Sequence, residues 1–215
     1  MRQSIRDFVA LMADLLPIQD PIYEFGSLQV AGQKGFADLR PLFPRCQYVG
    51  CDMRQGPGVD VLLNLHKIDL PNESAGTVLC LDTLEHVEYP RRAIDELHRI
   101  LKPNGIIVIS SVMDFPIHDY PFDYWRFTPE AFKSLLRPFS QSLCTYAGDA
   151  GFPHTVVGIG FKNPIDELDT VIASVDAWRI AQGPSALRSV VKPLVPPILL
   201  RAWDAGWRRW TRYTS

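Results

Sequence analysis

The sequence predicts an α/β domain built on a doubly wound, mostly parallel sheet that ends in an antiparallel strand pair. Three observations support this prediction. Short apolar runs alternate with helical patterns, most of the connecting segments read as short turns, and the last two runs are separated by Gly-Asp-Ala-Gly-Phe-Pro. With 215 residues, of which 47% are apolar, the chain can bury one domain core.

The helical segments are predicted from apolar spacing and end signals. Apolar residues three and four positions apart predict an amphipathic helix over 3–16, which ends before Pro17. A shorter helix-like segment covers 36–43. The segment 91–101 carries apolar residues on one helical face and stops at a Lys-Pro-Asn-Gly turn, and Thr128 followed by proline opens a third helix.

The strands are predicted from short apolar runs between these helices. In chain order the runs are 21–25, 47–51, 59–65, 77–81 and 106–110, followed by an antiparallel pair at 142–147 and 155–161. Strands that alternate with helices form right-handed βαβ units, which bind ligands at the carboxyl ends of the strands. The predicted fold is therefore Rossmann-like.

Composition excludes several classes of protein. Ordinary charge content and 11% aromatic residues exclude a disordered chain. No apolar run is long enough to span a membrane, and the first residues lack the core of a signal peptide, so a cytoplasmic protein is expected. The four cysteines have no ligand-like spacing and predict buried free thiols, and no metal is expected. The net charge of −2 gives no reason to expect nucleic-acid binding.

The turn after the first predicted strand lacks the Gly-x-Gly-x-x-Gly fingerprint of dinucleotide binding. Two acids nevertheless stand at strand ends. Asp52 directly follows the second predicted strand, a position from which a carboxylate can accept both hydroxyls of a ribose. Glu24 precedes Gly26, and a carboxylate at that position suits a cofactor with an ammonium or sulfonium group.

An ordered series of motifs over about residues 20–135 resembles the class I S-adenosylmethionine-dependent methyltransferases, in particular the small type-11-like enzymes. The motifs are Glu-Phe-Gly-Ser at 24–27, Gly-Cys-Asp-Met at 50–53, Asn-Leu-His at 64–66, Leu-Asp-Thr-Leu-Glu-His-Val at 81–87 and Leu-Lys-Pro-Asn-Gly at 101–105. The resemblance implies S-adenosyl-L-methionine as cofactor. Leu28 and Val30 replace the usual second and third glycines of the first motif.

The resemblance also implies which residues bind the cofactor. They are Glu24, Gly26 and Ser27 for its amino-acid end, Asp52 for the ribose, Met53, Asn64 and Leu65 for the adenine, and Asp82 and Thr83 for the methionine portion and sulfonium. Simpler interpretations compete with some of these roles. Asp52 could be a solvated strand-end acid, Met53 a core residue, Asn64 a turn former and His86 a structural histidine. Glu85 could simply face solvent on a helix that begins there.

A second motif, Phe-Pro-Ile-His-Asp-Tyr-Pro-Phe-Asp-Tyr-Trp-Arg-Phe at 115–127, follows the fifth strand. A loop this rich in aromatic and ionisable residues could close over an acceptor and exclude water, and similar stretches in the look-alike enzymes belong to the acceptor side. The candidate catalytic residues are His86, His118, Asp119, Tyr124 and Arg126, with a histidine as the base for a hydroxyl acceptor. The alternative is that the aromatic residues pack the loop and Arg126 pairs with Asp123 or Asp119. A metal site made of His118, Asp119 and Asp123 fits no established ligand spacing.

The sequence divides into a domain over 1–183 and a tail over 184–215. The tail holds six basic residues and one acid, so it carries +5 and the domain −7. Its tryptophans recur at helical spacing within 199–212, which predicts either an interfacial helix on an anionic membrane surface or packing on the domain or a second subunit. The interfacial option would place the protein at the inner face of the membrane.

Together these features predict a methyltransferase that uses S-adenosylmethionine and acts on a small-molecule, saccharide or lipid-linked acceptor. The alternative is a catalytically inactive regulatory or scaffold protein that has kept the cofactor-binding fold, because two glycines of the first motif are missing. A nicotinamide oxidoreductase fits less well, since the first loop lacks the dinucleotide fingerprint.

Overall fold

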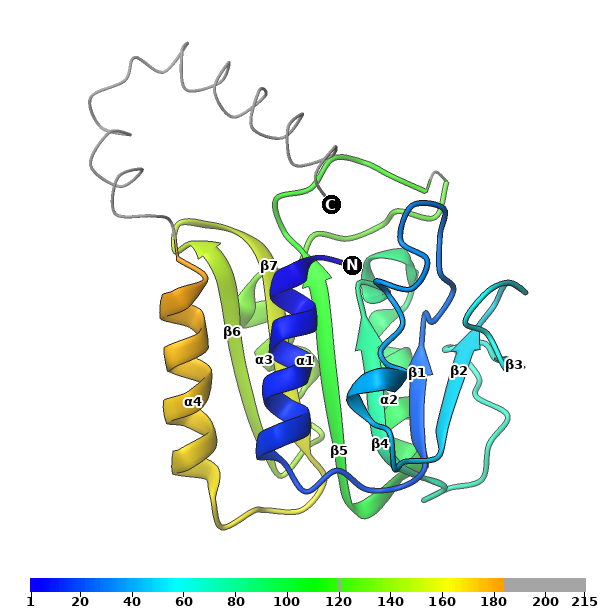
Figure 1. Ribbon diagram of the computed structural model, residues 1–215, viewed down its shortest axis with the longest axis horizontal. Coiled ribbons are helices and arrows are strands. Elements are labelled where there is room, and N and C mark those ends of the chain that lie inside the picture. Colours follow the sequence, from blue (N-terminus) through cyan, green and yellow to red (C-terminus); the bar gives the residue numbers. More distant parts are fainter. Residues whose placement is uncertain (120, 184–215) are drawn as a thin grey trace.

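The computed structural model describes residues 1–119 and 121–183. Within these residues one seven-stranded sheet runs in the order β3-β2-β1-β4-β5-β7-β6, with helices on both faces (Figure 1). This arrangement confirms the predicted doubly wound α/β fold. The predicted tail, including 199–212, lies outside the described residues.

The first five strands pair in parallel with one another, whereas β7 pairs antiparallel with both β5 and β6. The parallel strands are β1 (Ile22–Phe25), β2 (Tyr48–Asp52), β3 (Val61–Leu62), β4 (Ala75–Leu81) and β5 (Leu101–Val112). The antiparallel pair is β6 (Gln141–Asp149) and β7 (Phe152–Phe161), with β7 inserted between β5 and β6. The predicted terminal pair is therefore confirmed.

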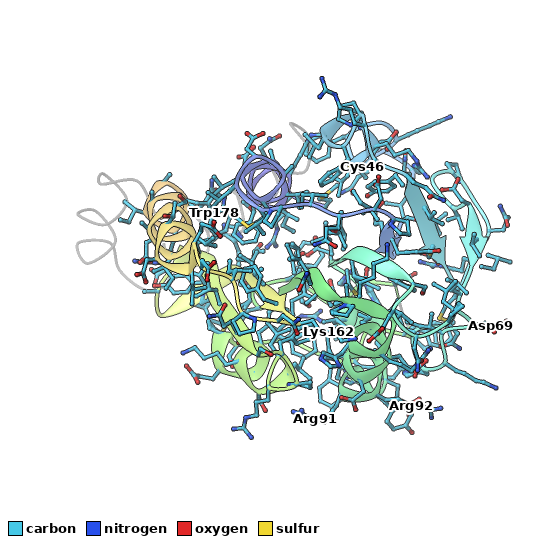
Figure 2. The ribbon with its side chains drawn as sticks, turned by 90° about the horizontal axis from the view of Figure 1, so that it is seen from below. Cys46, Asp69, Arg91, Arg92, Lys162 and Trp178 are labelled. Carbon is cyan, nitrogen blue, oxygen red and sulfur yellow. The ribbon has the colours of Figure 1, made fainter. Side chains whose placement is uncertain are left out.

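The helices divide between the two faces of the sheet (Figure 2). Helices α1 (Gln3–Leu15) and α4 (Leu168–Ala181) share one apolar cluster, in which the Phe8 and Trp178 rings lie 4.7 Å apart. Helices α2 (Pro90–Ile100) and α3 (Pro129–Leu135) share the other. Strand β4 is buried along its whole length and sends alternate side chains into the two clusters.

Three local predictions were wrong. The segment 36–43 holds only the 3₁₀ turn η1 (Arg40–Leu42), since Gly32 and Gly35 before it take positive φ and Pro41 lies within it. The turn expected at 102–105 lies inside β5, where a shift in register against β4 absorbs the extra residues. The strand expected over 59–65 shrinks to two residues, and α4 was not predicted.

The parallel strands all point their carboxyl ends to one edge of the sheet, where the loops after β1 and β5 gather (Figure 1). Parallel sheets bind ligands at this edge. Among the described residues, no helix is both long and apolar enough to cross a membrane.

Candidate functional site

Gly26, directly after β1, lies in close contact with Thr83 after β4. Its φ of +84° is in the left-handed region, and a Cβ there would lie 1.9 Å from the Thr83 Oγ1 atom. Its N–H group donates to the Cys51 carbonyl at 2.8 Å, as does the N–H group of Ser27 at 3.1 Å. The loop after β1 therefore has room only for glycine at this position. The N–H groups of Gly26 and Ser27 already donate to β2.

Glu24 is a buried carboxyl group two residues before this glycine. The Tyr48 hydroxyl donates to its Oε2 atom at 2.8 Å. No ion pair reaches Glu24 within the part of the chain that the structure describes, since Arg40 pairs with Asp38 and Asp60. Burial raises the pKa of Glu24 to about 7. A positively charged ligand group would therefore compensate a charge that the protein leaves without a direct partner.

Asp52 is the last residue of β2, and its side chain is 11% exposed. Its Oδ1 atom accepts the Arg54 N–H group at 2.9 Å, and its Oδ2 atom accepts the Leu28 N–H group at 3.4 Å. The carboxylate thus links the loops after β1 and β2. Met53 beside it exposes 69% of its surface, so it is not a core residue.

Asn64 and Leu65 lie in a tight turn beyond β3. The Asn64 Oδ1 atom accepts the His66 N–H group at 2.8 Å, which is the hydrogen bond of a turn former. Leu65 is buried in the cluster that packs on α2. Asn64 therefore acts as a turn former, which was the alternative interpretation of this residue. The Leu65 side chain lies in the core instead of at the open edge of the sheet.

Asp82 and Thr83 follow β4 and contact its neighbours on both sides. Asp82 has a φ of +44°, a conformation that non-glycine residues rarely adopt. Its N–H group donates to the Ser110 carbonyl at 3.0 Å, which ties it to β5. The Thr83 hydroxyl is 2.8 Å from the Leu81 carbonyl and 3.3 Å from that of Phe25. Strained residues of this kind cluster at functional sites.

Glu85 is the residue that the sequence did not reveal, because it was expected to face solvent. It is fully buried in the 3₁₀ turn η2 (Leu84–His86). The Ser111 hydroxyl donates to its Oε2 atom at 2.6 Å, whereas its Oε1 atom has no hydrogen-bond partner among the described residues. Burial, together with the Asp82 charge, raises the pKa of Glu85 to about 8. The sequence held one signal of this burial, because the apolar residues Leu84 and Val87 lie on either side of Glu85.

The structure brings together the two predicted acceptor-side histidines, His86 and His118. Their ring centres lie 4.7 Å apart, although one follows β4 and the other follows β5. The Nδ1 atom of His86 lies 2.7 Å from the Phe122 carbonyl oxygen. The Nδ1 atom of His118 lies 3.2 Å from both the Pro116 carbonyl oxygen and the Asp123 carboxylate.

The remaining candidates lie on the acceptor loop, defined here as residues 113–128 between β5 and α3. Asp119 forms an exposed ion pair with Arg54 at 3.1 Å, and Tyr124 is exposed. The Arg126 guanidinium pairs with Asp123 at 2.6 Å, which is the ion pair that the alternative interpretation of this loop expected. This pair holds the pKa of Asp123 well below its usual range.

Arg126 also organises the neck of the loop. Its Nε and Nη2 atoms donate to the Phe115 and Pro116 carbonyls, each at 3.0 Å. The Trp125 indole donates to the Val87 carbonyl at 3.0 Å, and the Phe127 ring is buried in the core. The donors of Arg126 are thus bound within the loop, and its catalytic role stays a prediction.

Comparisons with known proteins support the resemblance seen in the sequence. Residues 36–109 match the family model of a methyltransferase domain. A solved structure from Thermotoga maritima, described as a SAM-dependent methyltransferase and possible histamine N-methyltransferase, is 19% identical, with a TM-score of 0.54 over 76% of this chain and 100% of that one. No curated protein gives a significant match.

Two further solved structures are also similar. The CMeT domain of the citrinin polyketide synthase is 14% identical, with a TM-score of 0.56 over 75% of this chain and 52% of that one. The CurJ carbon methyltransferase is 14% identical, with a TM-score of 0.54 over 75% of this chain and 54% of that one. At these identities the likeness establishes the fold, and this chain spans about half the length of these two proteins.

Proposed function

We propose that this chain, which has the fold of S-adenosylmethionine-dependent methyltransferases and matches their domain model over residues 36–109, is an active methyltransferase. Its acceptor would be a small-molecule, saccharide or lipid-linked compound held beneath the acceptor loop. The observation that supports this proposal most directly is the placement of two acids, Glu24 and Asp52, near Gly26. Glu24 lies one residue before the end of β1 and Asp52 ends the neighbouring strand β2, while Gly26 directly after β1 lies against Thr83 after β4.

The same edge of the sheet is poorly suited to a dinucleotide. No α-helix follows β1 before β2 in the described chain, so the usual helix N-terminus for a pyrophosphate is missing. A buried Glu24 carboxylate would also repel phosphate. S-adenosylmethionine instead carries an ammonium and a sulfonium, which opposite charges stabilise.

Some of these residues would bind the cofactor, and others would align the acceptor with it. Bound S-adenosylmethionine supplies an electrophilic methyl group. Asp52 would accept the ribose hydroxyls, and Glu24 would support the cationic amino-acid end. Aligning an acceptor with the methyl group is worth roughly 7–11 kcal/mol of the barrier in favourable cases. Since the Nδ1 atoms of His86 and His118 contact oxygen atoms, their Nε2 atoms remain to bind the acceptor side.

We expect Asp52→Asn to weaken S-adenosylmethionine binding roughly 10- to 100-fold, because hydrogen bonds to a charged group contribute about 1.5–3 kcal/mol. Isothermal titration calorimetry measures this change. Asp69→Asn is the matched control, since Asp69 is an exposed acid outside the site, and it should bind like the unmodified chain. Equal affinities for both variants would contradict the ribose role.

Activity is tested by two measurements on the full chain. Calorimetry with S-adenosylmethionine and with NAD distinguishes the cofactors, and we expect binding of the first alone. Incubation with methyl-labelled S-adenosylmethionine and cell extract should then transfer label to a lipid, saccharide or small-molecule fraction. Failure to bind either nucleoside would overturn the proposal. Binding without transfer to any fraction would favour the inactive cofactor-binding alternative.

A further inference from the structure

We infer that Glu85, His86 and His118 form a binding site for a first-row divalent transition-metal ion. Each residue offers one ligand atom, and these atoms all lie within 4.8 Å of one another. The inference of metal binding depends on these side chains alone. Only its position beside the methyl acceptor rests on the proposed function.

Glu85 supplies the strongest argument. Its Oε2 atom is held by Ser111, so its Oε1 atom is the free ligand atom of a fully buried side chain. A buried carboxylate without a positive partner is costly, and no ion pair reaches Glu85 among the described residues. Arg126 does not supply one, because its guanidinium is bound to Asp123 and to loop carbonyls.

The two histidines have the supporting contacts that metal-binding imidazoles need. A ligating histidine usually donates its other ring N–H group to a carbonyl or carboxylate, which fixes the ring and its tautomer. The Nδ1 atom of His86 has the Phe122 carbonyl, and that of His118 has the Pro116 carbonyl and Asp123. With a proton on each Nδ1 atom, the Nε2 atoms carry the lone pairs that a metal requires.

The spacing is compatible with a metal after a small closure. Bonds of about 2.1 Å in tetrahedral geometry place ligand atoms about 3.4 Å apart. The present separations of up to 4.8 Å therefore exceed the bound geometry by about 1.4 Å at most. Rotation of the half-buried histidine side chains can supply this movement, since His86 is the last residue of η2 and His118 lies in the acceptor loop.

The ligand types select the class of metal. Magnesium and calcium prefer oxygen ligands alone, whereas imidazole nitrogen suits zinc, cobalt, nickel, copper and iron. Two imidazoles and one carboxylate also leave coordination positions for water or substrate, as in catalytic metal sites. This cluster differs from the set His118, Asp119 and Asp123, whose two acids are paired with Arg54 and Arg126.

The test uses the full chain, stripped of metal with a chelator and titrated with Co²⁺ in the absence of S-adenosylmethionine. We expect one Co²⁺ ion per chain, visible absorption bands of a coordinated ion, and displacement by Zn²⁺. Glu85→Gln and His118→Ala should each weaken Co²⁺ binding at least about 100-fold, because direct ligands matter more than their supporting residues. His98→Gln is the matched control, since His98 lies on α2 against Phe139, and it should keep full affinity.

Glu85→Gln keeps the size of the side chain and an oxygen atom for Ser111, so its metal-free form should melt no lower than the unmodified chain. This measurement separates loss of a ligand from loss of the fold. Absence of stoichiometric Co²⁺ binding, or equal binding by Glu85→Gln and the unmodified chain, would overturn the site. Neither outcome affects the calorimetric test with S-adenosylmethionine, so the two proposals can fail separately.

Discussion

Replacing Gly26 by alanine is expected to destabilise the fold and to reduce S-adenosylmethionine affinity by at least about 100-fold. The new Cβ atom would lie 1.9 Å from the Thr83 Oγ1 atom, and the φ of +84° is unfavourable for any side chain. Backbone strain of about 1–2 kcal/mol and overpacking of about 1–3 kcal/mol together predict a loss of about 2–5 kcal/mol in unfolding free energy. Chemical denaturation and calorimetry measure the two effects.

Gly32→Ala is the matched control for this substitution. Gly32 has nearly the same φ of +85°, but a Cβ there would meet no atom within 4 Å. It should therefore show the backbone strain without the collision, and its cofactor affinity should stay close to normal. Equal losses in the two variants would contradict a close contact between the loops after β1 and β4.

The second large effect is a pH-dependent stability caused by Glu24. Its folded pKa of about 7 lies above the ordinary value of 4.5, so the folded state binds the proton more tightly than the unfolded state. The free energy of unfolding should therefore fall as pH rises from about 4.5 to about 7, by up to about 3 kcal/mol. Glu24→Gln should remove the part of this fall that Glu24 causes and stabilise the cofactor-free protein above pH 7, while the part due to Glu85, whose pKa is raised to about 8, remains.

Cofactor binding should show the opposite pH dependence. The ionised Glu24 carboxylate attracts an ammonium group, so S-adenosylmethionine affinity should rise between pH 6 and pH 8 in the unmodified chain and rise less in Glu24→Gln. Denaturation and calorimetry across this range test both trends. Glu88→Gln, at an exposed acid, should behave like the unmodified chain. Identical pH profiles for the Glu24 and Glu88 variants would exclude the predicted role of Glu24.

The sequence predicts the sheet well because buried strands require continuous apolar runs. β4 and β5 are examples, and their alternation with helices determines the parallel order. The segment 36–43 was mispredicted because apolar spacing does not show how glycines at positive φ and Pro41 end a helix. The helix stop predicted at Lys-Pro-Asn-Gly is confirmed, since α2 ends at Ile100, but the sequence did not show that 102–105 continue into β5 as a bulge.

The candidate site was only partly predictable. Strand-end acids such as Asp52 follow directly from the order of strands and loops. Glu85 could not be assigned, since a regular helix would have turned it outward and the 3₁₀ turn η2 buries it. The contact between His86 and His118 joins loops far apart in the chain, and local spacing carries no information about such pairs.

The acceptor loop is fastened by several hydrogen bonds at its neck but by an exposed ion pair at Asp119. This difference in contacts affects how ligands reach the site. Its neck is fastened by Arg126 and by the N–H groups of Tyr124 and Trp125, which both donate to the Glu85 carbonyl. The Asp119 side chain contacts the opposite loop through an exposed ion pair with Arg54, which is worth at most about 1 kcal/mol. A free energy of this size corresponds to only about a fivefold change in an equilibrium constant. We therefore expect movement of the loop around Asp119 to cost little free energy and to become easier with added salt, while the neck contacts on the Glu85 carbonyl stay in place.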